Sequence, residues 1–194
     1  MSRKRCEPDD ASDLLIEYHD HQWGKPTFED RVLYEFLVLE SFQAGLSWNT
    51  ILRKRAAFRR ALDNYDYRKV AQYDDSKLDE LLNNADIIRN KPKLQAAITN
   101  AQQLIKVQEE YGSFARFLWA YVDNQPIDNQ LKDRRQADAK SDLSTAISKD
   151  LKKRGFKFVG PTMVYSFLEA VGLINNHEVS CFRYSEVKKV AIDL

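Results

Sequence analysis

The stretch Leu151–Leu173 places the strongest constraint on the fold, because it predicts two helices joined by a short hairpin. Three basic residues end the first helix, where the helix dipole favours cations. On both sides of the hairpin, apolar residues recur with the spacing of one buried helical face. The apolar positions are Leu143, Ile147 and Leu151 before the hairpin, and Met163, Val164, Phe167, Leu168 and Val171 after it. A helix pair of this kind belongs to an all-α core.

The hairpin between these helices also has features of a phosphate-binding turn. Phe156 and Val159 are placed to anchor the turn to the core, and Gly160 leaves the backbone amides of the next helix uncovered. Uncovered amides at a helix N-terminus attract anions, and Lys157 adds positive charge beside them. Two interpretations remain open from these residues: a seat for a DNA phosphate, or an ordinary turn within a helical core.

Composition limits the class of protein. The chain has 194 residues, of which 43% are hydrophobic and 11% aromatic, which is enough for one packed unit or two lobes sharing a core. Its formal net charge of +1 gives no information about a nucleic-acid partner, although basic residues gather in segments 53–60 and 152–157. There is no apolar run of about 18 residues and no apolar signal core at the N-terminus. We therefore expect a cytoplasmic protein that does not enter membranes.

The remainder of the chain predicts helices and no strand of useful length. Thr27 fits a helix cap, with acidic residues in the first turn after it. The helix expected after position 47 directs its apolar residues inward and its arginines outward. Further helices are expected over 76–84, 93–110 and 114–122, and the polar segment 123–140 is expected to be a loop between lobes. The predicted fold class is all-α.

One acidic residue falls within an apolar helical stripe. Glu40 follows Phe36 by four residues and Leu37 by three, so a helix that continues this far buries its carboxylate. Burying a lone carboxylate costs free energy unless it has a partner or a function. The sequence leaves two possibilities: a buried functional carboxylate, or a helix that frays before Glu40 and lets the carboxylate reach water.

Both cysteines and two of the three histidines are placed as metal ligands would be. Cys6 and His19 lie near the N-terminus, and His177 and Cys181 form an H-x3-C motif near the C-terminus. Two thiolates and two imidazoles complete a closed tetrahedral zinc site, which would be structural and would tie the chain ends together. His21 is an alternative ligand, which we expect to be exposed or to face DNA. Unligated residues remain the alternative, because H-x3-C is common by chance.

Three segments of the chain, in this order, resemble the 3-methyladenine DNA glycosylase I family: YHDHQWG (18–24), LESFQAGLSW (39–48) and KKRGFKFVGPTMVYSF (152–167). With the H-x3-C motif, the resemblance covers residues 6–181. It implies an all-α, two-lobed helix-hairpin-helix DNA glycosylase architecture in a single unit over 1–194. The implied lobes are 28–122 and 1–27 plus 141–194, joined by the loop 123–140. It also implies one structural Zn²⁺ per chain, held by Cys6, His19, His177 and Cys181.

The same resemblance implies a reaction and the residues that carry it. The expected enzyme is a monomer that flips 3-methyladenine out of alkylated double-stranded DNA and hydrolyses its N-glycosidic bond, leaving an abasic site without lyase action. Glu40 matches the carboxylate that reads the base and acts in catalysis. The base-binding positions are Tyr18, Trp48, Trp23 and Ser166, and the DNA-binding positions are Leu46, Gly45, Gly155, Lys157, Gly160 and Thr162. Leu46 is the candidate wedge for the emptied stack, with a core leucine as the alternative. The setting is bacterial, with nucleoid association during repair.

One residue departs from the pattern of the resembling family. Pro8 stands where the family usually has an aromatic residue, two positions after the first cysteine. One stacking face for the base is therefore absent or supplied from elsewhere. Two alternatives to the enzyme remain: a non-catalytic helix-hairpin-helix protein that binds alkylated DNA, and a zinc hydrolase, which needs an open metal position.

Overall fold

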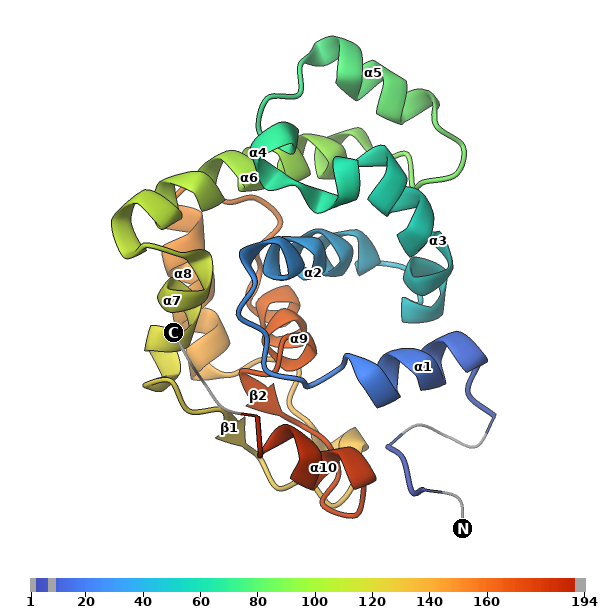
Figure 1. Ribbon diagram of the computed structural model, residues 1–194, viewed down its shortest axis with the longest axis vertical. Coiled ribbons are helices and arrows are strands. Elements are labelled where there is room, and N and C mark those ends of the chain that lie inside the picture. The colour runs from blue at the N-terminus through green and yellow to red at the C-terminus, as the bar shows by residue number, and fades with distance from the viewer. Residues whose placement is uncertain (1–2, 7–9, 191–194) are drawn as a thin grey trace.

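The computed structural model describes residues 3–6 and 10–190, and it is mostly helical, as the sequence predicts (Figure 1). Pro8 lies outside the described residues. The helices are α1 (Asp13–His21), α2 (Asp30–Gln43), α3 (Trp48–Ala61), η1 (Asp63–Tyr65), α4 (Tyr67–Val70), α5 (Asp75–Asn83), α6 (Lys91–Tyr111), α7 (Phe114–Trp119), η2 (Ala120–Val122), η3 (Arg134–Gln136), α8 (Asp142–Lys153), α9 (Pro161–Ala170) and α10 (Phe182–Val187), and the strands are β1 (Ile127–Asp128) and β2 (Ile174–Asn175). None of these helices is both long enough and apolar enough to cross a membrane.

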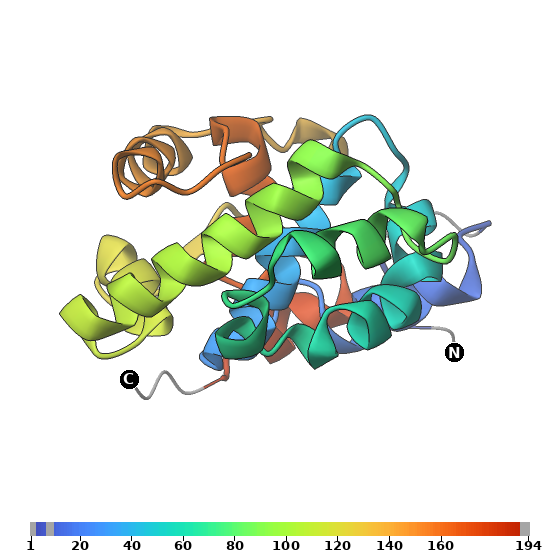
Figure 2. The same ribbon diagram turned by 90° about the horizontal axis from the view of Figure 1, so that it is seen from above.

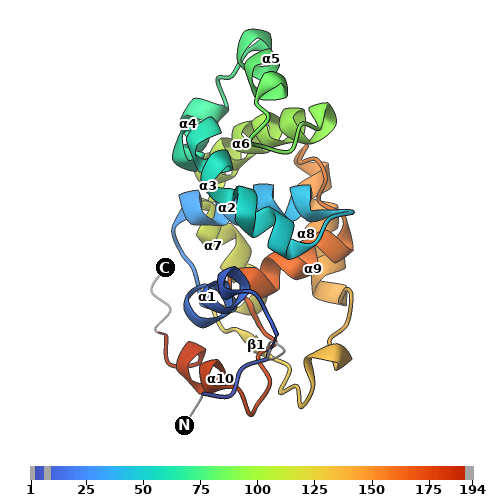
Figure 3. The same ribbon diagram turned by 90° about the vertical axis from the view of Figure 1, so that its right-hand side faces the viewer.

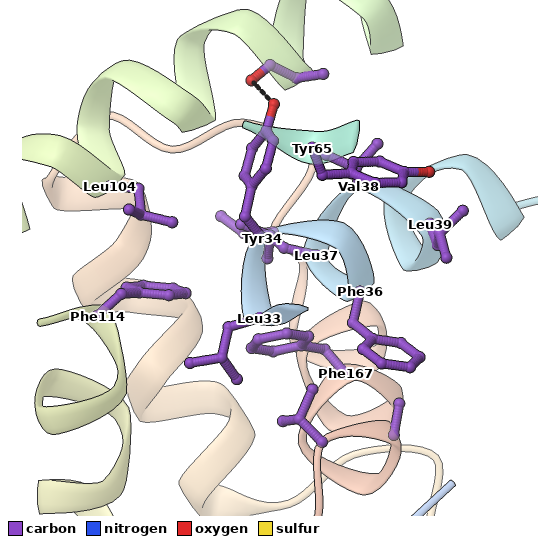
Figure 4. Close-up of a cluster of buried hydrophobic side chains, with 14 of the residues drawn as sticks. Leu33, Tyr34, Phe36, Leu37, Val38, Leu39, Tyr65, Leu104, Phe114 and Phe167 are labelled. Carbon is purple, nitrogen blue, oxygen red and sulfur yellow. Dashed lines mark hydrogen bonds between the residues drawn. The ribbon is translucent and has the colours of Figure 1, made fainter. Parts of the chain in front are cut away.

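Helix α2 lies at the centre of the molecule. Every residue from position 33 to position 42 is buried, and α2 contacts α3, α6, α7 and α9. Figure 4 shows Leu33 and Phe36 of α2 beside Phe167 of α9. The Tyr34 hydroxyl donates a hydrogen bond to the Ala97 carbonyl of α6 at 2.9 Å. Burial of each large apolar side chain contributes about 1.5–3 kcal/mol, so α2 fixes the position of the surrounding helices.

The other helices are arranged around α2 in two groups. Figure 3 shows α4, α5 and α6 towards one end of the molecule, and α1, α10 and the N-terminal segment towards the other. In Figure 2 the long α6, in light green, crosses the molecule between α8 and α9 on one side and α3 to α5 on the other. The N-terminal segment and the segment around α10 therefore lie near each other, although they are distant in sequence.

The start of α2 differs from the sequence prediction. Thr27 does not cap it, because the helix begins at Asp30 and the Thr27 hydroxyl donates to the Lys25 carbonyl instead. The Asp30 carboxylate accepts the backbone N–H groups of Phe114 and Ala115, each at 2.9 Å. It therefore caps the N-terminus of α7, where a helix dipole favours negative charge. A tertiary contact, rather than local capping, explains the acidic residue at this position.

The prediction that the arginines of α3 face outward is wrong for Arg55. Its Nε donates to the Glu35 carboxylate at 2.6 Å, and its NH1 donates to the Gln22 amide oxygen at 2.5 Å. Arg59 donates two further hydrogen bonds to Glu35. Glu35 is only 6% exposed, so these partners offset the cost of burying its charge. The network joins the end of α1 to α2 and α3.

The segment 123–140 contains structure that its composition does not predict. Ile127 and Asp128 of β1 pair in parallel with Ile174 and Asn175 of β2. The short helix η3 follows, with Asp133 as its cap. The backbone N–H of Arg134 donates to Glu178 at 3.0 Å. This segment is therefore attached to the region after α9 and brings Arg134 towards the centre of the protein.

Candidate functional site

A pocket of about 160 Å³ lies beside α2 and gathers residues from α1 and the turn after it, and from α2, α3, η3 and α9. It brings together all five residues that the sequence analysis assigns to catalysis and base binding. It also contains three residues that the sequence analysis does not single out. The expected lining residues are Tyr18, Trp23, Glu40, Trp48 and Ser166, and the additional ones are Gln43, Arg134 and Glu169. Among the described residues, no lysine lines this pocket.

Glu40 is buried in an intact helix. It is 6% exposed, and α2 continues to Gln43, so the alternative in which the helix frays before this residue is wrong. Burial, followed by repulsion from the Glu169 carboxylate, raises the pKa of Glu40 to about 8. The Glu40 carboxyl is therefore largely protonated at neutral pH in the ligand-free protein, and a positive charge in the pocket would favour its ionised form.

Aromatic rings form two sides of the pocket. Tyr18 and Trp48 have ring centroids 5.3 Å apart, with a tilt of 51° between their planes. On another side, the Arg134 guanidinium lies over the Trp23 ring, 4.2 Å from its centroid, which is a cation–π contact. Burial holds the pKa of the Tyr18 hydroxyl well above its ordinary value, so this hydroxyl is neutral. Such a pocket offers planar stacking surfaces next to a carboxyl group.

A second carboxylate enters the pocket from α9. The Glu169 Oε1 accepts a hydrogen bond from the Asn176 side chain at 2.5 Å. Asn176 is itself held by the hydroxyl of Tyr165 at 3.0 Å and by Asn129 at 2.7 Å. Burial raises the pKa of Glu169, while the Asn176 amide and the charge of Arg134 act in the opposite direction. Glu169 falls outside the apolar stripe of α9, and a helical residue outside that stripe is normally solvated, so periodicity alone does not reveal it.

The loop between α2 and α3 exposes an apolar residue. Gly45 has φ +83°, which only glycine adopts at little cost, and an added Cβ there meets no atom within 4 Å. Leu46, the next residue, is 38% exposed, so the alternative of a core leucine is wrong. Gln43 fixes this turn by donating its side-chain amide to the Leu46 carbonyl at 3.1 Å. The same residue lines the pocket, which places the exposed leucine close to the pocket's edge.

The hairpin between α8 and α9 has the anchors that the sequence predicts. Phe156 and Val159 are 2% and 1% exposed. The side chain of Asn100, on α6, forms two hydrogen bonds with the Lys157 backbone, at 2.7 and 3.0 Å. Gly155 has φ +94°, and Gly160 is the N-cap of α9 without a side-chain hydrogen bond. The hairpin backbone is therefore rigidly held.

Helix α9 connects the hairpin to the pocket. Thr162 is exposed in its first turn, next to Gly160. Ser166 and Glu169 lie one and two turns further along and line the pocket. Any group held at the hairpin is thus placed at a fixed distance from the pocket.

The four sequence-predicted metal ligands meet in one cluster. The ligand atoms of Cys6, His19, His177 and Cys181 all lie within 4.8 Å of one another. Cys6 Sγ is 3.5 Å from His177 Nδ1, and Cys181 Sγ is 3.5 Å from His19 Nε2 and 3.8 Å from His177 Nδ1. A tetrahedral zinc site with ordinary bond lengths has sulfur–nitrogen edges of roughly 3.5 Å. The spacing therefore fits a tetrahedral metal ion with four protein ligands.

The outer contacts of the two histidines also fit metal binding. The His19 Nδ1 lies 2.8 Å from the Asp20 carboxylate, and the His177 Nε2 lies 3.0 Å from the Trp23 carbonyl. Metal-bound imidazoles commonly donate their second N–H to such groups. Arg5 fixes the Asp20 carboxylate with hydrogen bonds at 2.7 to 3.0 Å. Burial lowers the pKa of His177, which favours the neutral form that binds metals.

A four-residue spacing would put His177 and Cys181 on one face of a helix, but neither residue lies in a helix. They lie in the loop after β2, and the backbone N–H of Cys181 donates to the Glu178 carbonyl at 2.8 Å. His21 is exposed, as expected, and its Nε2 lies 3.6 Å from the Glu17 carboxylate. The described residues therefore contain a closed four-residue cluster that can hold a metal ion.

Comparison with known proteins agrees with this arrangement. The profile of the methyladenine glycosylase family matches residues 9–184. DNA-3-methyladenine glycosylase 1 from Escherichia coli is 40% identical over 181 residues, covering 93% of this chain and 97% of that protein. The DNA-3-methyladenine glycosylase of Haemophilus influenzae is 38% identical over 177 residues, covering 91% and 96% of the two chains.

A solved structure of a 3-methyladenine DNA glycosylase is also similar to this protein in its fold. The 3-methyladenine DNA glycosylase I from Staphylococcus aureus, solved to explain its recognition of 3-methyladenine, superposes with a TM-score of 0.90 at 38% identity. The match covers 98% of this chain and 100% of that protein. The match of the profile, the sequences and the fold extends over nearly the whole chain, and the chain therefore belongs to the methyladenine glycosylase family.

Proposed function

We propose that the protein is a DNA glycosylase that removes 3-methyladenine from alkylated double-stranded DNA and leaves an abasic site. One observation carries this proposal: a buried carboxyl group, Glu40, lies in an aromatic pocket of a protein from this family. A base inside a duplex cannot reach such a pocket unless its nucleotide is flipped out of the stack. The flipped base would stack against Tyr18 and Trp48, with Trp23 and Ser166 completing the walls.

Glu40 supplies the chemical selectivity in this proposal. A 3-methylated adenine in DNA carries a positive charge and leaves readily, so its departure does not require protonation. The ionised Glu40 attracts that charge and accepts hydrogen bonds from the base, and a normal adenine gains less from both interactions. The N-glycosidic bond breaks with its electron pair going to the base, and water adds to the anomeric carbon of the sugar. Since no lysine lines the described pocket, no strand-cleaving lyase step is expected.

The exposed loop and the hairpin would hold the DNA. Leu46, on the turn formed by Gly45, would enter the gap that the flipped nucleotide leaves. Gly155, Lys157, Gly160 and Thr162 would bind the DNA backbone through uncovered amides and positive charge. These assignments agree with the exposure of Leu46 and the rigid support of the hairpin, and α9 links that support to the pocket.

We further propose that the metal in the Cys6–His19–His177–Cys181 cluster is a structural Zn²⁺, one per chain. Two thiolates and two imidazoles are typical ligands for zinc. Because four protein ligands close the coordination shell, this site would leave no position for a substrate, which argues against the zinc hydrolase alternative. When bound, the ion would stabilise the fold by joining the two chain ends.

The proposed architecture is the two-lobed helix-hairpin-helix glycosylase fold, in one unit over 1–194. The lobes would be 28–122 and 1–27 plus 141–194, with 123–140 between them. In this arrangement α2 separates the two groups of helices seen in Figure 3, and the base pocket lies against it. We propose that the protein acts as a monomer in the bacterial cytoplasm, at the nucleoid.

Release of the free base is the decisive test. Purified protein is incubated with methylated duplex DNA, and the released bases are separated and quantified. We expect free 3-methyladenine from the wild-type protein and at least about a hundredfold slower release from Glu40→Gln, because one preorganised electrostatic contact commonly contributes that much. The exposed Glu109→Gln serves as the control and should match the wild type.

The same assay separates the enzyme from the non-catalytic alternative. A protein that binds alkylated DNA without releasing any base would support the binding module and contradict the proposed reaction. Unchanged release from Glu40→Gln would remove Glu40 from the catalytic role. The same separation of released bases also measures the preference for 3-methylguanine. A further variant, Pro8→Trp, tests whether an aromatic residue at this position increases substrate affinity.

A further inference from the structure

The base pocket contains two carboxyl groups, and the proposed function uses only one of them. Glu40 enters from α2 and Glu169 from α9, and both line the same cavity. We propose that Glu169 is a second base-selecting carboxylate, which acts with Glu40 to favour methylated bases that carry a positive charge. This inference rests on the proposed glycosylase function and adds a specificity-determining residue to it.

The contacts of Glu169 fix its position without occupying both of its oxygens. Asn176 donates to Oε1 at 2.5 Å, and Asn176 is in turn bonded to Tyr165 and Asn129. No side chain or backbone amide among the described residues donates to Oε2. A carboxylate that is anchored by a hydrogen bond and lines a cavity presents a preorganised negative charge to a ligand.

The two carboxyl groups of the lining suit a positively charged base. Glu40 and Glu169 are the lining residues that become negative when they ionise. A cationic methylated base is attracted by these charges, whereas a neutral base gains no such attraction in the buried site. Without Glu169, only Glu40 can supply a negative charge to the lining.

The two carboxyl groups have different surroundings. Asn176 and the positive charge of Arg134 favour the ionised form of Glu169, although burial opposes it. At Glu40, repulsion from Glu169 adds to the effect of burial. We therefore expect Glu169 to hold the charge in the ligand-free pocket, and Glu40 to release its proton when a cationic base enters.

Other titratable groups near α2 do not provide this effect. The groups that share the pocket with Glu40 are Tyr18 of α1, Arg134 of η3 and Glu169 of α9. The buried charged side chains of α3 and α6 are engaged elsewhere. Arg55 and Arg59 of α3 are bonded to Glu35, and Lys93 of α6 is bonded to the carbonyls of Phe42 and Ala44. Glu169 is therefore the negatively charged group whose removal most directly changes Glu40.

The test compares Glu169→Gln with the wild type on two matched substrates. The amide keeps an oxygen acceptor for Asn176 but removes the charge. We expect kcat/KM for release of 3-methyladenine to fall about tenfold at high pH, because one favourable buried charge interaction is lost. Binding to a duplex that contains 3-deaza-3-methyladenine, which has the same shape but no charge, should change less than about threefold.

The pH profile separates a charge effect from a structural one. Excision by the wild type should rise with pH as Glu40 ionises. Removing the Glu169 charge lowers the pKa of Glu40, so the acidic limb of the kcat/KM profile should move to lower pH in Glu169→Gln. Glu169→Asp, which keeps the charge, should stay close to the wild-type limb. Zinc content and thermal unfolding, measured on every variant, confirm that the fold is intact.

Three outcomes would overturn the inference. Loss of activity with an unmoved acidic limb would indicate a merely structural role, and so would an equal loss of binding to the neutral duplex. Wild-type behaviour of Glu169→Gln, alongside an inactive Glu40→Gln, would exclude Glu169 while leaving the glycosylase function in place. If Glu169→Gln does not fold, the acidic limb of Glu169→Asp decides the matter. A limb that coincides with the wild-type limb supports the charge effect, and a limb that moves although the charge is kept contradicts it.

Discussion

The Lys93 ammonium group donates a hydrogen bond to the Ala44 carbonyl at 3.1 Å, which joins the first turn of α6 to the loop that follows α2. It donates a second hydrogen bond to the Phe42 carbonyl, also at 3.1 Å. Carbonyl groups at the end of a helix lack partners within the helix, so a lysine from another helix completes the end of α2. The loop in question carries Gly45 and Leu46.

Substitution of Lys93 should loosen this loop. Lys93→Met leaves two partly buried carbonyl groups without donors, which we expect to cost about 1–3 kcal/mol of unfolding free energy. Base excision should decrease further than this stability loss explains, because the position of Leu46 is no longer fixed. Urea unfolding and single-turnover excision measure the two effects. Lys91→Met, at the exposed start of the same helix, is the matched control and should behave as the wild type does.

The pKa of Glu40 makes stability depend on pH. Its folded-state pKa is raised from 4.5 to about 8, so the protonated form favours folding. The stabilising effect is fully present below the unfolded pKa and is lost as pH rises through the folded value. Relative to the wild type, Glu40→Gln should therefore gain stability between pH 5 and pH 9, by on the order of a few kcal/mol.

Urea unfolding of both proteins at pH 5, 7 and 9 measures this gain. A difference between wild type and Glu40→Gln that stays constant across these pH values would contradict the raised pKa. The prediction also links stability to activity, because the substitution that abolishes excision should make the protein more stable at alkaline pH.

The contact between Asp20 and His19 should support metal binding. Asp20→Asn keeps the size of the side chain but weakens the hydrogen bond to the imidazole, and we expect about 10–100-fold weaker zinc affinity. Competition with a chromophoric chelator measures this change. Glu17→Gln, an exposed substitution on the same helix, should leave the affinity unaltered. Equal affinities for all three proteins would show that the outer contact has no role.

Removal of the metal should lower thermal stability without directly changing the excision reaction. After chelation, we expect a lower Tm, with excision at low temperature retained by the fraction that stays folded. Readdition of Zn²⁺ should restore the Tm. If excision vanished while the folded fraction remained unchanged, the metal would have a direct part in the reaction.

A negative charge at the hairpin should weaken DNA binding without changing base preference. Gly160 has φ −66°, and an added Cβ meets no atom within 4 Å. Gly160→Asp therefore fits the backbone and even suits a helix N-cap, but it repels phosphate. We expect at least about fivefold weaker binding to methylated and unmodified duplexes alike. Gly160→Ala adds bulk without charge and should bind as the wild type does. A change in base preference alone would contradict the assignment of the hairpin to the DNA backbone.

The sequence predicts the regular parts of this structure well, because their signals are local. The periodicity of α8 and α9 places Ile147, Leu151, Val164 and Phe167 in the core, as observed. The position of Glu40 on an apolar stripe indicates burial as one of two possibilities, and the intact helix α2 shows that burial is the correct one. Spacing within the sequence is sufficient for these features, since helix geometry converts it directly into a face.

Features that depend on tertiary contacts are not predicted from the sequence. Asp30 caps α7 rather than the helix in which it lies, and Arg55 turns inward because Glu35 is buried opposite it. Arg134 reaches the pocket from an aperiodic segment through the pairing of β1 with β2. Glu169 has no sequence signal other than its charge. In each case the partner is distant in the sequence, and periodicity does not report on such partners.

The metal cluster imposes an order on biosynthesis. His19 and Cys181, whose ligand atoms lie 3.5 Å apart, are separated by 162 residues. At ordinary rates of translation, the second half of the ligand set is made roughly 8–30 s after the first. During that interval Cys6 and His19 lack the other two members of the ligand set, although α1 can already contact α3. The four ligands can therefore meet only after Cys181 has been made, so binding of a metal ion at this cluster would follow the synthesis of α2 to α9.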